Sequence, residues 1–480
     1  MTPGFLEPVE VDRPTVRALV LVPELIGRAG SGDAGSGPGE GRGSRSGRAS
    51  AGVTHSLEDR VVEAEGLARA IDLNVADAIE VRIARPRPAT LFGTGKVEEI
   101  GQAVEDLDTG LVIVDHALTP IQQRNLERAW NAKVLDRTGL ILEIFGRRAR
   151  TREGALQVEL AHLMFQRSRL VRSWTHLERQ RGGFGFLGGP GETQIETDRR
   201  LLRDRIEKVR NDLEKVTRTR ALHRSGRAKV PYPIVAIVGY TNAGKSTLFN
   251  RLTGADVLSQ DQVFATLDPT MREVALESGR HIIVSDTVGF ISDLPTMLVA
   301  AFRATLEEVV AADVILHVRD ISHPETEAQC ADVEAVLHDL LDPEPDKKNE
   351  APSVAPVIEV WNKIDQVDAE TRADIEAAQR KASLASDAPV VTSAITGEGL
   401  DELMARVDQL LARNDVVVTV ALPAAAGQLR NWIYENTTVL DVQPSLDDSG
   451  ASSFRIRIGE HRYGQLLHRL EAAGLTAAHK

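Results

Sequence analysis

The feature that most constrains this chain is a glycine-rich segment between an apolar run and the start of a helix. The apolar run Ile234–Val238 reads IVAIV, and Gly239–Ser246 after it reads GYTNAGKS, shortly before LFNRL. A strand, such a loop and a helix in this order form a phosphate-binding loop, whose backbone N–H groups surround an anion at a helix N-terminus. The chain is therefore predicted to contain an α/β nucleotide-binding domain with a mainly parallel sheet flanked by helices.

Two residues of this loop have predicted chemical roles. Lys245 brings a mobile positive charge to the β- and γ-phosphates, which makes it a predicted catalytic residue. The Ser246 hydroxyl is placed to ligate Mg²⁺. The whole loop is predicted to contact the nucleotide: Gly239, Tyr240, Thr241, Asn242, Ala243, Gly244, Lys245 and Ser246.

A second motif, DTVG, follows the apolar run HIIVS. Asp286 at a strand end is suited to orient a metal-bound water, and Gly289 can present its N–H to the γ-phosphate because it has no Cβ. The predicted contacts are Asp286, Thr287, Val288 and the catalytic Gly289. The next residue is Phe290, where related enzymes place a water-orienting glutamine. Either Phe290 is a packing residue and another group orients the water, or a partner completes the site, and we expect slow intrinsic hydrolysis.

The segment FATLD lies between these motifs, with Thr266 20 residues past Ser246. Thr266 is predicted to ligate Mg²⁺ through its hydroxyl and to contact the γ-phosphate through its N–H. Thr270 is the rival for this role. The predicted contacts of this segment are Phe264, Ala265, Thr266, Leu267 and Asp268.

The tetrapeptide NKID after the run VIEV indicates which base is bound. Guanine presents an N1–H and an amine side by side, and the carboxylate of Asp365 can accept from both. Adenine presents an acceptor at N1, so it is disfavoured. Lys363 is expected to lay its stem along the base and Asn362 to pin neighbouring loops, while Ser393–Ala394 offers a backbone N–H to the guanine O6. The predicted base contacts are Asn362, Lys363, Ile364, Asp365, Ser393, Ala394 and Ile395.

Four regions are expected along the chain. Residues 1–150 form a small α/β domain with a mainly parallel sheet and a flexible Gly/Ser-rich insertion at 27–52. Its expected elements include a strand at Leu111–Val114 and a helix at Pro120–Trp130. Residues 151–229 form a long helical hairpin. Residues 230–413 form the nucleotide-binding domain, and residues 414–480 a small α/β domain. The helical seams of the hairpin consist of Leu156, Leu160, Leu163, Leu170, Trp174 and Leu177, and of Leu202, Ile206, Val209, Leu213 and Val216.

The hairpin is basic although the protein is acidic. Residues 147–229 contain 21 Lys and Arg against 10 Asp and Glu, while the whole chain has a net charge of −13. Its predicted tip, 182–191, holds six glycines in ten residues. Charge alone leaves two alternatives, a nucleic-acid contact and a solvated arginine-rich surface.

Composition excludes several other classes of protein. The single cysteine, Cys330, cannot build a disulfide framework or a thiolate metal cluster, which favours a reducing compartment. No apolar window reaches the length of a membrane span, and no secretory signal is recognisable at the start. A cytoplasmic location without stable membrane insertion is expected.

Together these motifs resemble the HflX family of GTPases. The resemblance covers GYTNAGKS, FATLD, DTVGFI and NKID, and more specifically GGPGETQIETDRR at Gly188–Arg200 and GTGKVEEI at Gly93–Ile100. It implies a cytoplasmic GTPase that binds the large ribosomal subunit and splits stalled or idle ribosomes under stress such as heat. It also implies that the helical hairpin contacts ribosomal RNA near the peptidyl-transferase centre.

The prediction is thus a Mg²⁺-dependent GTP hydrolase, monomeric when soluble, with GTP, GDP and the large subunit with its ribosomal RNA as partners. One alternative is a GTPase of ribosome assembly or RNA maturation. Another is a regulatory switch that binds a protein through acidic surfaces and is indifferent to the basic hairpin. The sequence leaves open the role of residues 27–52, the hairpin residues that contact RNA and any use of ATP by the N-terminal domain.

Overall fold

The structure is a computed structural model of the chain. It describes residues 16–26, 55–180, 190–227, 232–255, 264, 266, 269–295, 303–341, 355–382, 388–413, 415–423, 425–444, 451–475 and 477–479. The predicted insertion at 27–52 and residues 182–189 of the predicted tip lie outside these ranges. The chain divides into two compact units, one mainly Met1–Lys215 and the other mainly Val216–Lys480 without short segments near 261–264 and 295–301. Among the described residues, no helix combines the length and apolar character that crossing a membrane requires.

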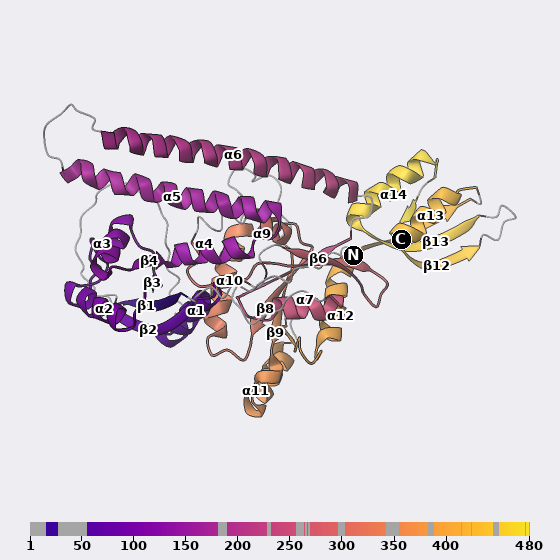
Figure 1. The fold of residues 1–480 in the computed structure, drawn as a ribbon. Coiled ribbons are helices and arrows are strands. Elements are labelled where there is room, and N and C mark those ends of the chain that lie inside the picture. The colour runs from indigo at the N-terminus through magenta and orange to yellow at the C-terminus, as the bar shows by residue number, and fades with distance from the viewer. Residues whose placement is uncertain are drawn as a thin grey trace, which may run out of the picture. The chain divides into compact units, whose positions relative to one another are not determined.

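A four-stranded parallel sheet forms the centre of the first unit (Figure 1). Its strand order is β2-β1-β3-β4, with β1 at Arg17–Leu25, β2 at Asn74–Ile83, β3 at Leu111–Val114 and β4 at Lys133–Asp136. This confirms the predicted parallel sheet. The sequence interpretation did not identify β4, because its sequence KVLD has only two apolar residues, whereas β3, also four residues long, is the continuous apolar run LVIV.

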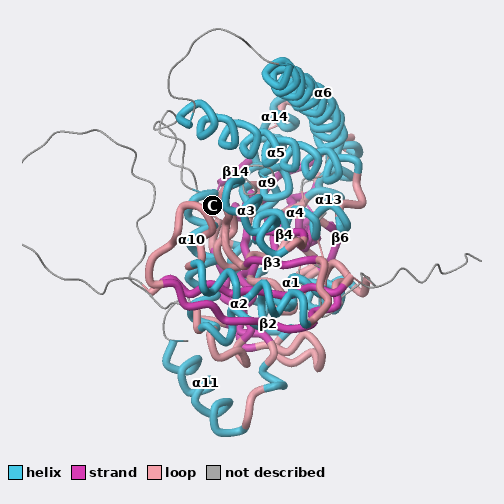
Figure 2. The backbone as a smooth tube through the Cα atoms, turned by 60° about the vertical axis from the view of Figure 1, so that its left-hand side comes forward, coloured by secondary structure: helices cyan, strands magenta, loops and turns pink. Residues whose placement is uncertain are grey.

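Helices cover both faces of this sheet: α1 (Leu57–Arg69), α2 (Thr94–Asp106), α3 (Pro120–Trp130) and α4 (Arg137–Arg148). Ile100 and Val104 of α2 and Leu126 and Trp130 of α3 share a core with alternate residues of the strands. The alternation of strands and helices can be followed in Figure 2. Thr119 begins α3 with a capping box to Gln122, which fixes the start of that helix.

Two long helices, α5 (Arg152–Gln180) and α6 (Pro190–Arg227), form the predicted hairpin. They run side by side in Figure 1, and Arg205 of α6 forms an ion pair with Glu159 of α5. In α6 the expected seam residues Ile206 and Val209 are buried.

Two details of the hairpin prediction were wrong. The most buried side chains near the start of α5 are Gln157, Val158 and Ala161, while Leu156, Leu160 and Leu163 are only half-buried. The reason is that α5 also contacts α3 and α4, which changes the face that it buries. In addition, the predicted tip extended to residue 191, but α6 already begins at Pro190, because proline suits the first turn of a helix.

The nucleotide-binding domain lies in the second unit and is built on a six-stranded sheet of order β10-β9-β8-β5-β7-β6. Its strands are β5 (Ile234–Gly239), β6 (Thr270–Ala275), β7 (His281–Asp286), β8 (Val314–Asp320), β9 (Val357–Asn362) and β10 (Val390–Val391). All neighbours pair in parallel except β6, which pairs antiparallel with β7. The carboxyl ends of the parallel strands meet at one edge, where ligands bind in such sheets.

Helices again cover this sheet: α7 (Lys245–Thr253), α9 (Arg303–Val310), α10 (Thr326–Leu341), α11 (Ala369–Ala382) and α12 (Leu400–Ala412). Leu248 and Phe249 of α7 share one core with Leu403 and Val407 of α12. A short 3₁₀ helix, Ile364–Gln366, follows β9 and contains part of the NKID motif.

The C-terminal part of the second unit is a four-stranded antiparallel sheet of order β12-β13-β11-β14. It comprises β11 (Asp415–Leu422), β12 (Thr438–Pro444), β13 (Ser452–Gly459) and β14 (Ala477–His479), with α13 (Gly427–Asn436) and α14 (Glu460–Ala472). Both helices share a core with alternate residues of β11 and β13. The sequence interpretation missed β12, because this edge strand is mostly exposed and lacks an apolar alternation.

Candidate nucleotide-binding site

The phosphate-binding loop connects β5 to α7, as its sequence predicts. Gly244 precedes the helix with a φ of 92°, and a Cβ there would lie 2.3 Å from Nδ2 of Asn362. Asn242 also adopts a positive φ, 61°. The loop therefore needs a glycine at 244 for both its backbone conformation and its close packing against the NKID motif.

Lys245 is the first residue of α7 and is buried. Its Nζ donates to the carbonyl oxygen of Tyr240 at 2.6 Å. The pKa of Lys245 is lowered to about 8, mainly by burial; the carboxylate of Asp286 opposes this shift and the positive charge of Lys363 contributes to it. An ammonium with so low a pKa is a mark of a functional site rather than of a solvated surface lysine.

Three side-chain oxygens converge beside Lys245. Oγ of Ser246 and Oγ1 of Thr266 lie 2.8 Å apart, and they donate to Oδ2 of Asp286 at 2.8 and 2.9 Å. Burial raises the pKa of Asp286, while these two hydrogen bonds and the charge of Lys245 oppose that rise. Among the described residues, its buried Oδ1 has no hydrogen-bond partner.

This donor set fits Mg²⁺, which binds hydroxyl and carboxylate oxygens. The orphaned Oδ1 of Asp286 supports this assignment, since a buried carboxylate oxygen without a partner is costly. Thr270, the rival of Thr266, begins β6 opposite Asp286 in the sheet register but makes no hydrogen bond to this cluster in the described residues. The geometry therefore favours Thr266 as a metal ligand.

The DTVG motif packs directly on the phosphate-binding loop. A Cβ at Gly289 would lie 2.9 Å from both Nζ of Lys245 and Cγ2 of Thr241. The backbone N–H of Thr241 donates to the carbonyl of Phe290 at 2.7 Å, and the N–H of Phe290 donates to Gly239 at 3.1 Å. A glycine at position 289 therefore allows the DTVG motif to pack this closely against the phosphate-binding loop.

Phe290 is a packing residue, since its side chain is 1% exposed. It therefore cannot orient a water molecule for attack. The neighbouring Ser292 donates its backbone N–H to the hydroxyl of Tyr240 at 2.8 Å. Tyr240 thus ties the phosphate-binding loop to the segment after DTVG, a contribution that the sequence motif did not reveal.

Asn362 connects three loops at the other end of the site. Its Nδ2 donates to the carbonyl of Ala243 at 2.9 Å, and its Oδ1 accepts from the N–H of Ala394 at 3.0 Å. The predicted pinning role is therefore present in the geometry. The expectation that Ala394 presents its N–H to a guanine O6 requires exchange of this second hydrogen bond and stays a prediction.

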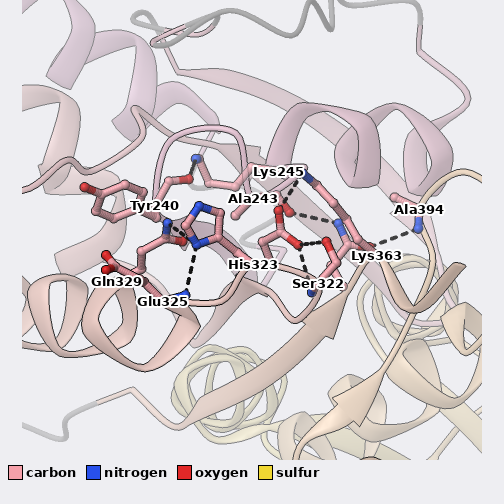
Figure 3. Close-up of polar contacts among 11 residues, drawn as sticks. Tyr240, Ala243, Lys245, Ser322, His323, Glu325, Gln329, Lys363 and Ala394 are labelled. Atoms are coloured by element: carbon pink, nitrogen blue, oxygen red, sulfur yellow. Dashed lines mark hydrogen bonds and ion pairs between the residues drawn. The ribbon is translucent and has the colours of Figure 1, made fainter. Parts of the chain in front are cut away.

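Lys363 and Asp365 follow Asn362, where the backbone of Lys363 adopts a φ of 68°. Nζ of Lys363 donates to Oδ2 of Asp320 at 2.7 Å, whereas Asp365 is exposed. Figure 3 shows Lys363 close to Ala243 and Lys245 of the phosphate-binding loop. The sequence interpretation missed Asp320, although its position at the end of β8 matches that of Asp286 at the end of β7.

The remaining predicted residues divide into three groups. Thr287, Val288, Ile364 and Ser393 are buried, and the backbone N–H of Ser393 donates to Glu398 at 3.0 Å. Ile395 is 64% exposed. Phe264 is buried with its ring edge-on to that of Phe145 in the first compact unit, with the ring centroids 4.7 Å apart. Three predicted contacts lie outside the described residues: Ala265, Leu267 and Asp268.

The sheet topology, the phosphate-binding loop and the NKID motif define a P-loop GTP-binding protein. Comparison with known protein families supports this class along most of the chain. Residues 58–146 match the N-terminal region of GTP-binding GTPases and residues 148–227 their middle region. Residues 234–363 match the 50S ribosome-binding GTPase family, and residues 377–477 match the HflX C-terminal domain.

Curated relatives place the chain within a family. It is 52% identical to a GTPase HflX of Magnetococcus marinus over 360 residues, which cover 75% of this chain and 79% of that protein. It is 43% identical to GTPase HflX of Escherichia coli over 403 residues, covering 84% and 90%. The chain therefore belongs to the HflX family of GTPases and hydrolyses GTP.

A solved structure of a GTP-binding protein from Sulfolobus solfataricus in complex with GDP is also similar. It is 21% identical, with a TM-score of 0.41, and the match covers 82% of this chain and 98% of that one.

Proposed function

We propose that this GTPase requires Mg²⁺, acts in the cytoplasm as a monomer, and binds the large ribosomal subunit through its basic helical hairpin to split stalled or idle ribosomes under stress. The observation that carries this proposal is the exposed basic surface of α6 in a protein that also holds a GTP site. Five of its basic residues are exposed within 11 positions: Arg200, Arg203, Arg205, Lys208 and Arg210. The match of residues 234–363 to ribosome-binding GTPases supports the same partner.

Not every arginine of the hairpin is available for RNA. Arg169 forms an ion pair with the buried Asp136 at 2.7 Å, and its guanidinium lies 4.1 Å from the ring centroid of Phe165. Arg205 pairs with Glu159. Arg169 thus joins α5 to the end of β4, and Arg205 joins α6 to α5. The other exposed basic residues of α6 are therefore the better candidates for contacts to RNA phosphates.

In the proposed reaction, Ser246 and Thr266 would hold Mg²⁺ and Asp286 would orient a water bound to it; when bound, the ion would supply positive charge beside the phosphates. The ammonium of Lys245 leaves the carbonyl of Tyr240 to pair with the β- and γ-phosphates. The N–H of Gly289 contacts the γ-phosphate, so loss of that phosphate releases the segment that carries it. Because Phe290 is buried, we propose that intrinsic hydrolysis is slow and that the ribosome raises it.

Co-sedimentation with separated ribosomal subunits tests the partner. The protein is pelleted with each subunit in GDP or in a non-hydrolysable GTP analogue, across a salt series. We expect pelleting with the large subunit that is selective for the GTP analogue and weakens as salt rises. A sucrose-gradient assay on intact ribosomes then measures their separation into subunits. If the ribosomes stay intact, a role in ribosome assembly or RNA maturation is favoured instead.

A matched pair of variants separates the hairpin from general charge effects. Arg203→Glu with Arg210→Glu reverses two exposed charges on α6, whereas Arg380→Glu with Lys381→Glu reverses two exposed charges at the end of α11. Only the α6 variant should lose binding. The slope of its log binding constant against log salt concentration should decrease by roughly one for each lost phosphate contact. Equal binding by both variants would favour a protein partner instead.

A further inference from the structure

The carboxylate of Asp320 stands at the end of β8, between the phosphate-binding loop and the NKID motif. Asp320 is 8% exposed and lies opposite Asn362 in the parallel register of β8 and β9. The N–H of Ile321 donates to the carbonyl of Asn362 at 3.0 Å, which fixes this end of the strand pair. A buried carboxylate is stable only when charged or polar groups surround it.

The two oxygens of Asp320 have different partners. Oδ1 accepts from the N–H of Ser322 at 3.1 Å and from its hydroxyl at 2.6 Å, and Oδ2 accepts from Nζ of Lys363 at 2.7 Å. Ser322 therefore sets the orientation of the carboxylate, so that one oxygen faces the ammonium. Ser322 and Lys363 lie close together in Figure 3.

This ion pair holds a long side chain in one place. The ammonium of Lys363 is largely buried in the pair, with 17% of its side chain exposed. It lies near a second buried ammonium, since the charge of Lys363 lowers the pKa of Lys245. Without a counter-charge, the two ammonium groups would repel each other and Lys363 would turn toward solvent.

We propose that Asp320 is a positioning residue for guanine-nucleotide binding, which holds the ammonium of Lys363 so that its methylene stem lies along the purine. The inference rests on the assignment of Asn362–Asp365 to the base. Fixing the four-carbon stem before the ligand arrives removes an entropic cost of binding. The effect belongs to affinity and not to hydrolysis, because Asp320 contacts the base end of the site.

The first test is Asp320→Asn, which keeps the shape of the side chain and removes its charge. We expect the Kd of GDP and of a non-hydrolysable GTP analogue to rise about tenfold each, a loss of about 1.4 kcal/mol. The kcat at saturating GTP should stay unchanged. The matched control is Glu359→Gln, because Glu359 forms an ion pair with Arg319 across the same two strands and does not contact Lys363.

A double-mutant cycle with Lys363→Met shows whether Asp320 acts through Lys363. We expect Lys363→Met alone to weaken binding and Asp320→Asn to add little in that background. Additive effects, or wild-type affinity for Asp320→Asn, would overturn the inference. Wild-type affinity for Lys363→Met would instead overturn the assignment of NKID to the base.

Ser322→Ala keeps the test decisive if Asp320→Asn does not fold. It removes the 2.6 Å hydrogen bond that orients the carboxylate but leaves the buried ion pair in place. We expect a rise of about threefold in the Kd of both nucleotides, since a net hydrogen bond of this kind contributes modestly. Unchanged affinity in a folded Ser322→Ala protein would count against a positioning role.

Discussion

The two ends of the nucleotide site differ in what holds their side chains. At the phosphate end, the groups that would bind the ligand contact one another: Ser246, Thr266 and Asp286 form a hydrogen-bonded cluster, and Lys245 donates to Tyr240. At the base end, Asn362 donates to Ala243 and Lys363 to Asp320, neither of which is a predicted base contact, while Asp365 is exposed. Asn362 also accepts from the N–H of Ala394, which is a predicted base contact.

This difference separates switching from specificity. Contacts at the phosphate end must be exchanged when Mg²⁺ and phosphate bind, so they suit a segment that responds to the nucleotide state. Contacts of Asn362 to Ala243 and of Lys363 to Asp320 can persist in the complex. The predicted contact of the Ala394 N–H with guanine requires only the exchange of its hydrogen bond to Oδ1 of Asn362.

Asp365→Asn should change the base that is bound. The asparagine side chain has one accepting oxygen and one donating NH₂ group. With guanine, this NH₂ group would face the donating amine of the base. With xanthine, the oxygen accepts from N1–H and the NH₂ group donates to the carbonyl that replaces the amine. We expect affinity for GTP to fall on the order of a thousandfold and XTP to be preferred, because an unpaired buried polar group discriminates strongly. Competition binding measures both affinities, and a variant that still prefers GTP would move the base contact to another residue.

Thr266→Ala should affect only the phosphate end. Loss of a metal-ligating hydroxyl should reduce kcat for GTP hydrolysis about a hundredfold, within the range for lost transition-state groups, and leave the Kd of GDP within about twofold. The matched control is Thr270→Ala, because Thr270 begins β6 outside the cluster. Single-turnover hydrolysis distinguishes the two threonines, and equal loss in both variants would contradict the assignment.

Nucleotide affinity should also depend on pH through Lys245. Burial lowers its pKa to about 8, and a phosphate requires the charged ammonium. Below that pH the lysine is already charged, whereas above it binding must take up a proton, so affinity falls as pH rises. We expect the Kd of GDP to increase about fourfold from pH 7 to pH 8.5. Calorimetry in two buffers measures the proton uptake, and guanosine, which lacks phosphates, serves as the control that should show no such change.

Tyr240→Phe is expected to have the smallest effect. It removes the hydroxyl that accepts from the N–H of Ser292 at 2.8 Å. The free energy of unfolding should fall by about 1 kcal/mol, and guanosine binding should not change. Urea denaturation measures the difference against Tyr434→Phe, a control at an exposed tyrosine of α13. Weaker guanosine binding in Tyr240→Phe would show that the two ends are coupled.

Much of the fold was accessible from the sequence, because several elements are long or strongly patterned. The strand at Leu111–Val114 and the helix at Pro120–Trp130 were predicted with the bounds that the structure shows. Elements with few apolar or buried residues were missed: β4 has only two apolar residues between Lys133 and Asp136, and β12 is an edge strand with little buried surface. The spacing of apolar residues predicts a helix or strand only when that element buries one of its faces.

The order and spacing of the nucleotide motifs were sufficient to predict a guanine-nucleotide domain. Each motif follows an apolar strand, and parallel strands bring their carboxyl ends to one edge of the sheet, so residues far apart in sequence could be placed together. The family comparisons confirmed the HflX assignment. The individual contacts of the site residues stay predictions for the experiments above.

What the sequence determined by itself was the class of chemistry, because that depends on residue types at fixed local spacings. What only the tertiary structure decided was which side chains meet across the sheet and the hairpin. It showed the hydroxyl of Thr266, rather than that of Thr270, hydrogen-bonded to Asp286. It also showed Lys363 paired with Asp320 and Arg169 paired with Asp136. Such pairs join positions 20 to 43 residues apart, and their geometry depends on strand order and helix packing, which no local pattern encodes.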